Sequence, residues 1–252
     1  MNTTPPLDAG GRLRAALASS PPSARLQAAM SAGTHPRPEY VEPLIERCAS
    51  EPDLNVRETL TWALMRHPSS ITVPLLIDET RSATTQARSQ ALHTLSKIGD
   101  PAGWAAITPE VINDADDQVA RTAWRVAVAL VPEGSEHELA DRLVAQLGRG
   151  AHDIRLSLSR ALIALGDSAV ALLEKVAEQG TESERVHAIA TQRLRDCPED
   201  GFDAALVDAE LTVMLSDTAE PGSATGPDLG AEADAENDVD LEPDPGPSAG
   251  DS

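Results

Sequence analysis

Apolar and polar positions alternate through the middle of the chain with the period of an α-helix. Ile154, Leu158, Ala161, Leu162 and Leu165 recur at steps of three and four, which places them on one face of a helix. A glycine follows them, and glycine readily adopts the left-handed conformation that ends helices. A second apolar run, "AVALLEKVAEQ", comes directly afterwards. The pattern therefore predicts two helices joined by a tight turn.

The sequence of this helix and its turn is repeated elsewhere in the chain. The segment "ARSQALHTLSKIGD" (87–100) matches "IRLSLSRALIALGD" (154–167) in its arginine, its leucine and its closing Gly-Asp. An arginine marks this register throughout, with steps of 30 to 34 residues, at Arg25, Arg57, Arg88, Arg121, Arg155 and Arg185. Eleven residues after the four central arginines comes a residue that ends helices, namely Pro68, Gly99, Pro132 or Gly166. The sequence is thus built from repeats of just over thirty residues.

Each repeat predicts a first and a second helix. The expected first helices are 23–31, 55–66, 86–98, 117–130, 153–164 and 183–195, and the expected second helices are 39–49, 71–81, 102–113, 136–147 and 168–179. Pro74 and Pro109 fall inside second helices and predict kinks there. A pair of helices cannot bury its apolar stripe alone, so successive pairs must stack and share a core. We predict an all-α solenoid of about six helical hairpins.

The repeats divide the chain into three parts. Residues 1–22 are expected to be a flexible or shortly helical lead, and residues 23–216 the solenoid, with "DAALVDAELTVML" (203–215) as a candidate last helix. From residue 217 onward the sequence is rich in Asp, Glu, Pro, Gly, Ala and Ser. With little apolar area and much like charge, 217–252 is predicted to be a disordered acidic tail.

The repeat units resemble HEAT repeats, in particular the short bacterial form also seen in bilin lyases. The resemblance lies in "DLNVRETLTWAL" (53–64), "TTQARSQALHTLSKIGD" (84–100), "DDQVARTAWRVA" (116–127) and "DIRLSLSRALIALGD" (153–167). It implies an armadillo-like superhelix whose second helices line the concave face. It also implies a structural ladder in which Arg57, Arg88, Arg121, Arg155 and Arg185 pair with acidic residues and tie neighbouring units together.

Composition refines this expectation. Aromatic residues make up only 2 % of the chain, so the core must be aliphatic, which suits closely packed helices. Two distant cysteines and the lack of an export signal at the N-terminus predict a cytoplasmic protein. Arginine greatly outnumbers lysine and alanine is abundant, which is typical of a GC-rich bacterial genome.

The net charge of −21 is distributed unevenly. No Lys or Arg follows Arg195, and 17 of the 41 Asp and Glu residues lie between Asp196 and Ser252. Residues 1–195 carry the remaining 24 acids and all 20 bases, a net charge of −4. Within this nearly balanced body the predicted first helices hold 12 bases and 4 acids, whereas the second helices hold 4 bases and 11 acids. Opposite faces of the stack should therefore carry opposite charge.

No residue pattern indicates catalysis. The six histidines are scattered, without a H-E-x-x-H motif or a nearby cysteine partner, and no metal or cofactor site is expected. An acidic groove would repel nucleic acid, whose binding depends on neutralised phosphates, and would attract a basic partner. We therefore predict a non-catalytic scaffold that binds a partner protein on the acidic second helices. The expected contact residues are Glu42, Glu46, Asp78, Glu79, Trp104, Glu138, Asp141, Glu174 and Glu178.

Two other functions remain open at this level. One is an enzyme or chaperone like the bilin lyases, which would need a deep apolar pocket and would carry an absorbing chromophore. The other is a nucleic-acid-binding module similar to HEAT-like DNA glycosylases, which would retain DNA in a salt-sensitive way. The bases of the first helices that lie outside the ladder suggest a third interaction, because the acidic tail could fold back onto them. These bases are Arg66, Lys97, Arg125, Arg160, Arg193 and Arg195.

Overall fold

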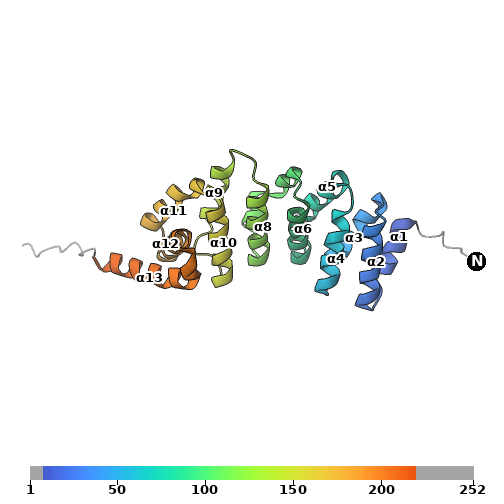
Figure 1. Ribbon diagram of the computed structural model, residues 1–252, viewed down its shortest axis with the longest axis horizontal. Helices are drawn as coiled ribbons and strands as arrows, with labels where there is room; N and C mark the ends of the chain where they lie inside the picture. Colours follow the sequence, from blue (N-terminus) through green and yellow to red (C-terminus); the bar gives the residue numbers. More distant parts are fainter. Residues whose placement is uncertain (1–7, 220–252) are drawn as a thin grey trace, which may run out of the picture.

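The computed structural model describes residues 8–219 as an elongated stack of helices that advances steadily from one end of the chain to the other (Figure 1). Within this range every regular element is helical, as the periodicity predicted. Six helices succeed one another as a first layer: α2 (Pro22–Thr34), α4 (Leu54–Met65), α6 (Thr85–Ile98), α8 (Asp117–Leu130), α10 (His152–Ala164) and α12 (Glu182–Asp196).

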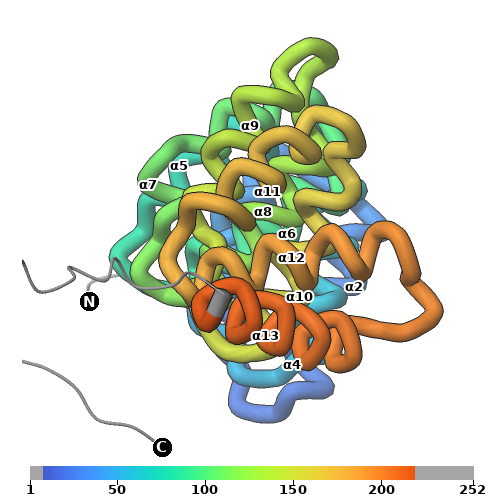
Figure 2. Tube along the Cα trace, turned by 90° about the vertical axis from the view of Figure 1, so that its left-hand side faces the viewer, coloured from blue at the N-terminus to red at the C-terminus, as the bar shows by residue number. Residues whose placement is uncertain are grey.

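A second layer packs against the first. It contains α1 (Ala9–Leu17), α3 (Val41–Cys48), α5 (Ser69–Glu79), the 3-10 helix η2 (Pro101–Ala106), α7 (Pro109–Ile112), α9 (Glu136–Val144) and α11 (Asp167–Gln179). The remaining elements are the 3-10 helices η1 (Pro38–Tyr40) and η3 (Pro198–Asp200) and the last helix, α13 (Gly201–Ala219). Most second-layer helices pack against the first-layer helix that follows them in the chain, as α1 does on α2, α3 on α4, α5 on α6 and α11 on α12. Helices of one layer also pack on their neighbours in that layer, so the fold is a solenoid (Figure 2).

One continuous aliphatic core runs between the layers. It extends from Leu13 in α1 to Ala188 in α12, and its largest fully buried side chains are leucines, together with Trp124 and Ile112. The Trp124 indole donates a hydrogen bond to the Ile112 carbonyl oxygen at 3.0 Å, so its one polar atom is satisfied. The scarcity of aromatic residues is therefore matched by a core in which small and branched aliphatic side chains bring helices close together.

Local sequence signals set the helix boundaries. The side chain of Asp53 caps α4 by accepting a hydrogen bond from the backbone N–H of Val56, and Asp116 caps α8 in the same way through Val119. Gly99 closes α6 with φ of 66°, a left-handed conformation that glycine adopts without strain. The repeated phrases in the sequence thus encode both the start and the end of first-layer helices.

The prediction of one continuous second helix at 102–113 is wrong. This segment forms η2 and the four-residue helix α7, separated at Ile107 and Thr108. Pro109 cannot donate the backbone hydrogen bond that a continuous helix would need, so it begins a new helix instead. Pro74, in contrast, lies inside α5, which continues without a break from Ser69 to Glu79.

The two ends of the stack differ from the expected boundaries. Within the predicted lead, 1–22, residues Ala9–Leu17 form α1, which enters the core through Leu13 and Leu17. At the other end, α13 continues to Ala219, three residues beyond the expected limit of the solenoid. It packs on α12 through a separate apolar cluster that includes Phe202, Ala209 and Val213. The rest of the predicted disordered tail, 220–252, lies outside the described residues.

Candidate protein-binding surfaces

The acidic residues predicted to bind a partner all come from the second layer, but they differ in availability. Glu42, Asp78, Glu138, Asp141, Glu174 and Glu178 are exposed, while Glu79 is half-buried. Burial raises the pKa of Glu79, since desolvation disfavours its charged form. The exposed carboxylates are distributed over α3, α5, α9 and α11, so the structure gathers them on one layer without bringing them into a single cluster.

Several of these carboxylates already have partners within the chain. Arg14 of α1 donates from Nε to Glu46 at 2.7 Å and also reaches Glu42 at 3.4 Å. This hydrogen bond lowers the pKa of Glu46. Asp78 pairs with Arg81 at 3.2 Å, and Glu138 pairs with Arg142 one turn away. These contacts partly neutralise the acidic residues of the N-terminal units.

The carboxylates of Asp141, Glu174 and Glu178 make no hydrogen bond or ion pair with any other residue in the range 8–219. They lie on α9 and α11, which pack side by side in the second layer. We call these three residues the α9/α11 acidic patch. These residues differ from the other predicted acidic residues, most of which form ion pairs within the chain, although Glu174 also interacts electrostatically with Arg195.

Trp104, the predicted aromatic anchor, lies in η2 rather than in an α-helix. It is half-buried and packs against the continuous core. Trp62 is more accessible, with 40 % of its surface exposed, and lies on first-layer helix α4 near the exposed Met65. Sequence reasoning did not select Trp62, because helical periodicity alone does not show which face of α4 a neighbouring helix covers.

The arginines of the predicted ladder form two kinds of contact: some pair with acidic residues of the next unit, and others bind backbone carbonyl oxygens of loops. Arg88 donates from Nε and Nη2 to the two carboxylate oxygens of Asp114 at 2.7 and 2.9 Å. Arg121 pairs with Asp153 at 2.8 Å, and Arg185 pairs with Asp217 at 2.7 Å. Each of these bonds joins one unit to the next.

Arg57 and Arg155 instead bind the loops that precede their own helices. Arg57 donates to the backbone carbonyl oxygens of Glu51 and Pro52 at 2.8 and 3.1 Å. Arg155 donates from Nε to the carbonyl oxygen of Gly150 at 3.1 Å. Arg88 makes both types of contact, since its Nη1 also reaches the carbonyl oxygen of Ser82. The repeated arginine therefore anchors an inter-unit loop even where no acidic partner is present.

The most buried member of the series is Arg25, which was in register but outside the predicted ladder. It donates two hydrogen bonds, each of 2.8 Å, to the fully buried carboxylate of Glu51. Arg47 and the backbone N–H of Asp53 also donate to Glu51. Burial alone raises the pKa of Glu51, but these hydrogen bonds outweigh it and lower the pKa to about 2.

His187 and Cys48 carry chemically reactive groups, but both side chains are buried in the folded chain. The His187 ring accepts a hydrogen bond from the Gly148 N–H and contacts the Ser159 hydroxyl and the Arg155 carbonyl oxygen. Burial lowers the pKa of His187 to about 4 and raises that of Cys48 to about 12. Among residues 8–219 no group of three or more His, Cys, Asp and Glu side chains is arranged to hold a metal ion.

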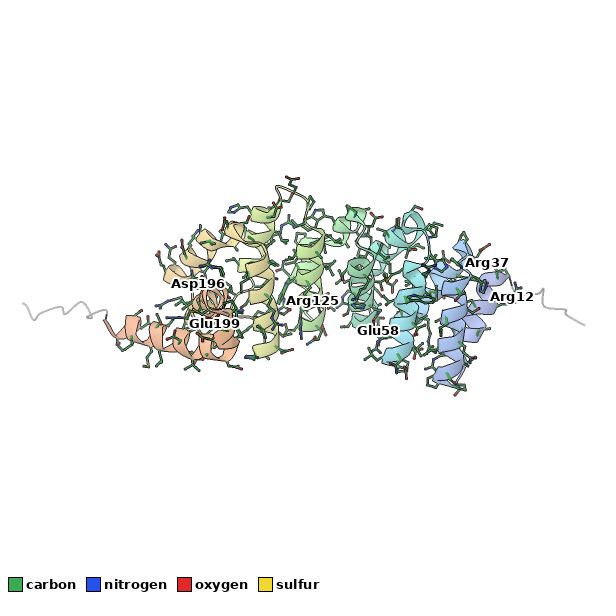
Figure 3. All side chains as sticks on the ribbon, viewed as in Figure 1. Arg12, Arg37, Glu58, Arg125, Asp196 and Glu199 are labelled. Atoms are coloured by element: carbon green, nitrogen blue, oxygen red, sulfur yellow. The ribbon has the colours of Figure 1, made fainter. Side chains whose placement is uncertain are left out.

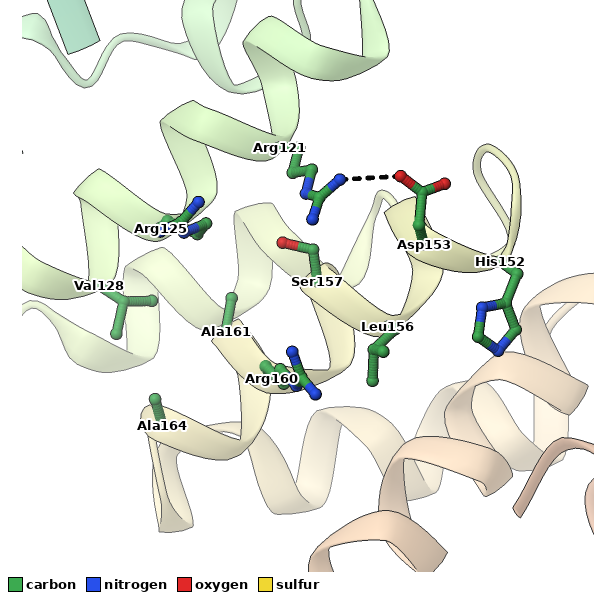
Figure 4. A pocket seen from close by; sticks show the side chains of 10 residues that line it. All are labelled: Arg121, Arg125, Val128, His152, Asp153, Leu156, Ser157, Arg160, Ala161 and Ala164. Atoms are coloured by element: carbon green, nitrogen blue, oxygen red, sulfur yellow. Dashed lines mark hydrogen bonds and ion pairs between the residues drawn. The ribbon is translucent and has the colours of Figure 1, made fainter. Parts of the chain in front are cut away.

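A groove on the first layer, between α8 and α10, was not predicted as a site. Its volume is about 540 Å³. Arg121, Arg125 and Arg160 surround it together with His152 and Asp153, and its apolar wall is formed by Val128, Leu156, Ala161 and Ala164 (Figure 4). Arg125 lies near the middle of the stack, far from Asp196 and Glu199 at the C-terminal end (Figure 3).

None of the described helices combines the length and apolar character needed to cross a membrane. Residues 12–96, which include most of α1 and extend into α6, match the family model described as HEAT repeats. No curated protein sequence matches the chain significantly. A crystal structure of an engineered protein from the Northeast Structural Genomics Consortium is similar with a TM-score of 0.45 and 14 % identity, covering 83 % of this chain and 98 % of that one.

Proposed function

We propose that this chain is a non-catalytic HEAT-repeat scaffold that binds a basic partner protein through the exposed acidic residues of its second layer, because residues 12–96 match the HEAT-repeat model and the helices stack as a solenoid. HEAT repeats suggest a role in protein interaction. A stack of neighbouring helix pairs offers an extended surface along which a partner can make many separate contacts.

The observation that carries this proposal is that Asp141, Glu174 and Glu178, on two adjacent helices, are exposed and make no hydrogen bond or ion pair within the range 8–219. Like charges that are not needed for folding are available to a partner, and charge complementarity accelerates encounter and selects against partners of the wrong sign. The paired residues Glu42, Glu46, Asp78 and Glu138 extend the surface along the stack. Glu79 and Trp104 contribute less, because both are half-buried.

Reversal of the patch tests this proposal. The triple variant Asp141→Lys/Glu174→Lys/Glu178→Lys should lose its partner in affinity capture with the full chain as bait, quantified by mass spectrometry at low and moderate salt. The partner retained by the unaltered chain should be basic and should be released progressively by salt, since exposed ion pairs are screened.

A matched variant controls for net charge. Glu39→Lys/Glu199→Lys/Glu210→Lys introduces the same change at three exposed acidic residues outside α9 and α11, and it should retain the partner. Equal retention by both triple variants, with unchanged circular dichroism, would place the binding surface elsewhere. Recovery of nucleic acid or of a coloured small molecule in place of a basic protein would contradict the scaffold function itself.

A further inference from the structure

The groove between α8 and α10 is lined by one arginine that forms an ion pair and two that do not. Arg121 is held at its edge by the ion pair with Asp153, whereas Arg125 and Arg160 are exposed and make no hydrogen bond or ion pair with any residue in the range 8–219. The close view shows these three guanidinium groups and the apolar side chains arranged around one hollow (Figure 4). Two arginines thus remain without a counter-ion beside an accessible cavity.

Other groups around the groove oppose this charge or are already satisfied. Burial lowers the pKa of the half-buried His93 of α6, and Lys97 and Arg125 lower it further, whereas Glu58 of α4, 3.6 Å from the His93 Nε2, raises it. On the α6 side the positive charge of Arg125 is therefore opposed by an acidic residue. His152 lies at the opposite rim, 2.7 Å from the carboxylate of Asp203 in α13. The Asp153 carboxylate is occupied by Arg121. The field at the centre of the groove is therefore set by Arg125 and Arg160.

The walls of the groove indicate that its ligand has apolar as well as acidic groups. Val128 and Leu156 are half-buried, and Ala164 is exposed at the margin. Apolar surface of this kind gains stability when it is covered, while arginines at its edge bind carboxylates. A peptide in which acidic and aliphatic residues alternate satisfies both requirements when it lies extended, because successive side chains then point to opposite sides.

Such a peptide is present in this chain beyond α13. Residues 220–252 contain ten acidic residues and no Lys or Arg, and the sequence Asp-Val-Asp-Leu-Glu at 238–242 alternates acidic and aliphatic side chains. The start of α13 lies close to the groove, since the Phe202 and His152 rings are 5.3 Å apart. The helix then leads away from α10 (Figure 1).

The connecting chain is long enough to return. The 19 residues of α13 span about 28 Å at the usual rise per residue. The 18 residues from 220 to 237 can extend over roughly 60 Å. Contacts that are individually weak can still be well populated in this situation, because tethering raises the local concentration of the segment to about the millimolar range.

We propose that the acidic segment 238–242 of this chain docks in the α8/α10 groove, with its carboxylates on Arg125 and Arg160 and its aliphatic side chains on the wall formed by Val128 and Leu156. This interaction involves the first layer and does not depend on the proposed binding of a basic partner to the second layer.

Paramagnetic relaxation in the full-length chain tests this proposal. A spin label is attached at Asn237→Cys in a Cys197→Ser background, since Cys197 is exposed while the buried Cys48 thiol has its pKa raised to about 12 and stays unreactive. At low salt, amide signals of α8 and α10 should lose intensity while those of α9 and α11 keep theirs. Adding salt should restore the lost signals.

Variants identify the two sides of the contact. Arg125→Gln/Arg160→Gln and, separately, Asp238→Asn/Asp240→Asn/Glu242→Gln should each abolish the intensity loss. The control variant Arg66→Gln/Lys175→Gln removes two other exposed bases and should preserve it. Circular dichroism melts establish that the compared variants are equally folded, so that a changed signal reflects docking and not unfolding.

Three results would overturn the proposal. Intensity loss that is absent, or equal on both layers, would show that the segment does not select the groove. Loss that persists in Arg125→Gln/Arg160→Gln would show that these arginines do not hold it. The third result concerns docking between two molecules, which is tested by mixing spin-labelled chain with isotope-labelled chain that carries no spin label. Intensity loss that arises only between molecules would show that the groove binds the segment of a second copy.

Discussion

At the scale of single residues, the buried carboxylate of Glu51 is stabilised because both of its oxygens accept hydrogen bonds. The Glu51 carboxylate receives hydrogen bonds from Arg25, Arg47 and the Asp53 N–H, and its side chain has no exposed surface. The removal of one member of such a group is costly because the others stay buried without a counter-ion. The network also joins the loop before α2 to the loop before α4, since Arg25 binds the Ser19 and Ser20 carbonyl oxygens.

The Glu51→Gln variant should therefore be less stable than the unaltered chain by about 3 kcal/mol at pH 7. The pKa of Glu51 is lowered from 4.5 to about 2 on folding, so its contribution is fully present above pH 4.5 and is lost as the pH falls toward 2. The difference between the two proteins should shrink over that range. Urea unfolding followed by circular dichroism at pH 7, 5 and 3 measures it.

The control for this experiment is Glu178→Gln, which removes an exposed carboxylate without a partner among the described residues. Its free energy of unfolding should stay within about 0.5 kcal/mol of the unaltered value at each pH. A difference between Glu51→Gln and the unaltered chain that is as large at pH 3 as at pH 7 would show that the loss comes from packing and not from the charge of Glu51.

At the scale of elements, α2 and α4 approach each other closely at Gly33, which has no side chain. A Cβ atom at Gly33 of α2 would lie 2.4 Å from Cζ3 of Trp62 and 2.9 Å from the Cα of Ala63, both in α4. The indole of Trp62 can stay partly exposed because it lies over Gly33. This contact determines how the first two units pack, and neither residue stands out in the periodic pattern.

The Gly33→Ala variant should push α2 and α4 apart and destabilise the N-terminal units by roughly 1–3 kcal/mol. Alanine has a higher intrinsic helix propensity than glycine by about 1 kcal/mol, and this gain opposes the destabilisation. The measured loss of stability should therefore lie toward the lower end of the expected range. Thermal unfolding and the emission of Trp62 would report it. The substitution Ser31→Ala on the exposed face of the same helix should leave both quantities unchanged; a stabilised Gly33→Ala would mean that Trp62 can move aside freely.

The last helix depends on its own small core. Phe202, Ala209 and Val213 of α13 pack with Val186 and Ala190 of α12, separately from the continuous core. Phe202→Ala should therefore release α13 while the rest of the stack stays folded. Hydrogen exchange should accelerate in α13 and remain unchanged in α2–α8. Leu211→Ala, an exposed residue of α13, is the matched control, and faster exchange throughout the chain in Phe202→Ala would contradict a separate unit.

At the scale of the whole molecule, contacts between neighbours alone hold the stack together. No helix bridges distant units among residues 8–219, so a local defect should weaken the nearby units more than the far end.

A cavity in one unit tests this expectation. Leu158 of α10 is fully buried, and Leu158→Ala should cost about 3 kcal/mol locally. Hydrogen exchange should become faster in α8, α10 and α12 than in α2 and α4. The corresponding variant Leu60→Ala in α4, also fully buried, should show the opposite gradient. Equal acceleration along the chain in both variants would show that the solenoid unfolds as one cooperative unit.

The sequence by itself determined the helical repeat and the positions at which its helices begin and end. Apolar steps of three and four can only be buried on one side of a helix, and the recurring Asp, Arg, Gly and Pro residues set the helix ends through backbone chemistry that acts within a few residues. For this reason the first-layer helices were predicted nearly to their boundaries. The predicted segregation of charge between first and second helices follows from the same local pattern.

Only the tertiary structure decided which charges are free. The pairing of Arg14 with Glu46, the burial of Glu51 between two arginines and the convergence of Arg121, Arg125 and Arg160 on one groove join residues from different helices. Distances of this kind depend on how far each unit is rotated against the next, which is set by the sum of many side-chain contacts. Periodicity specifies which face of a helix is buried, and the stacking of whole units specifies what that face meets.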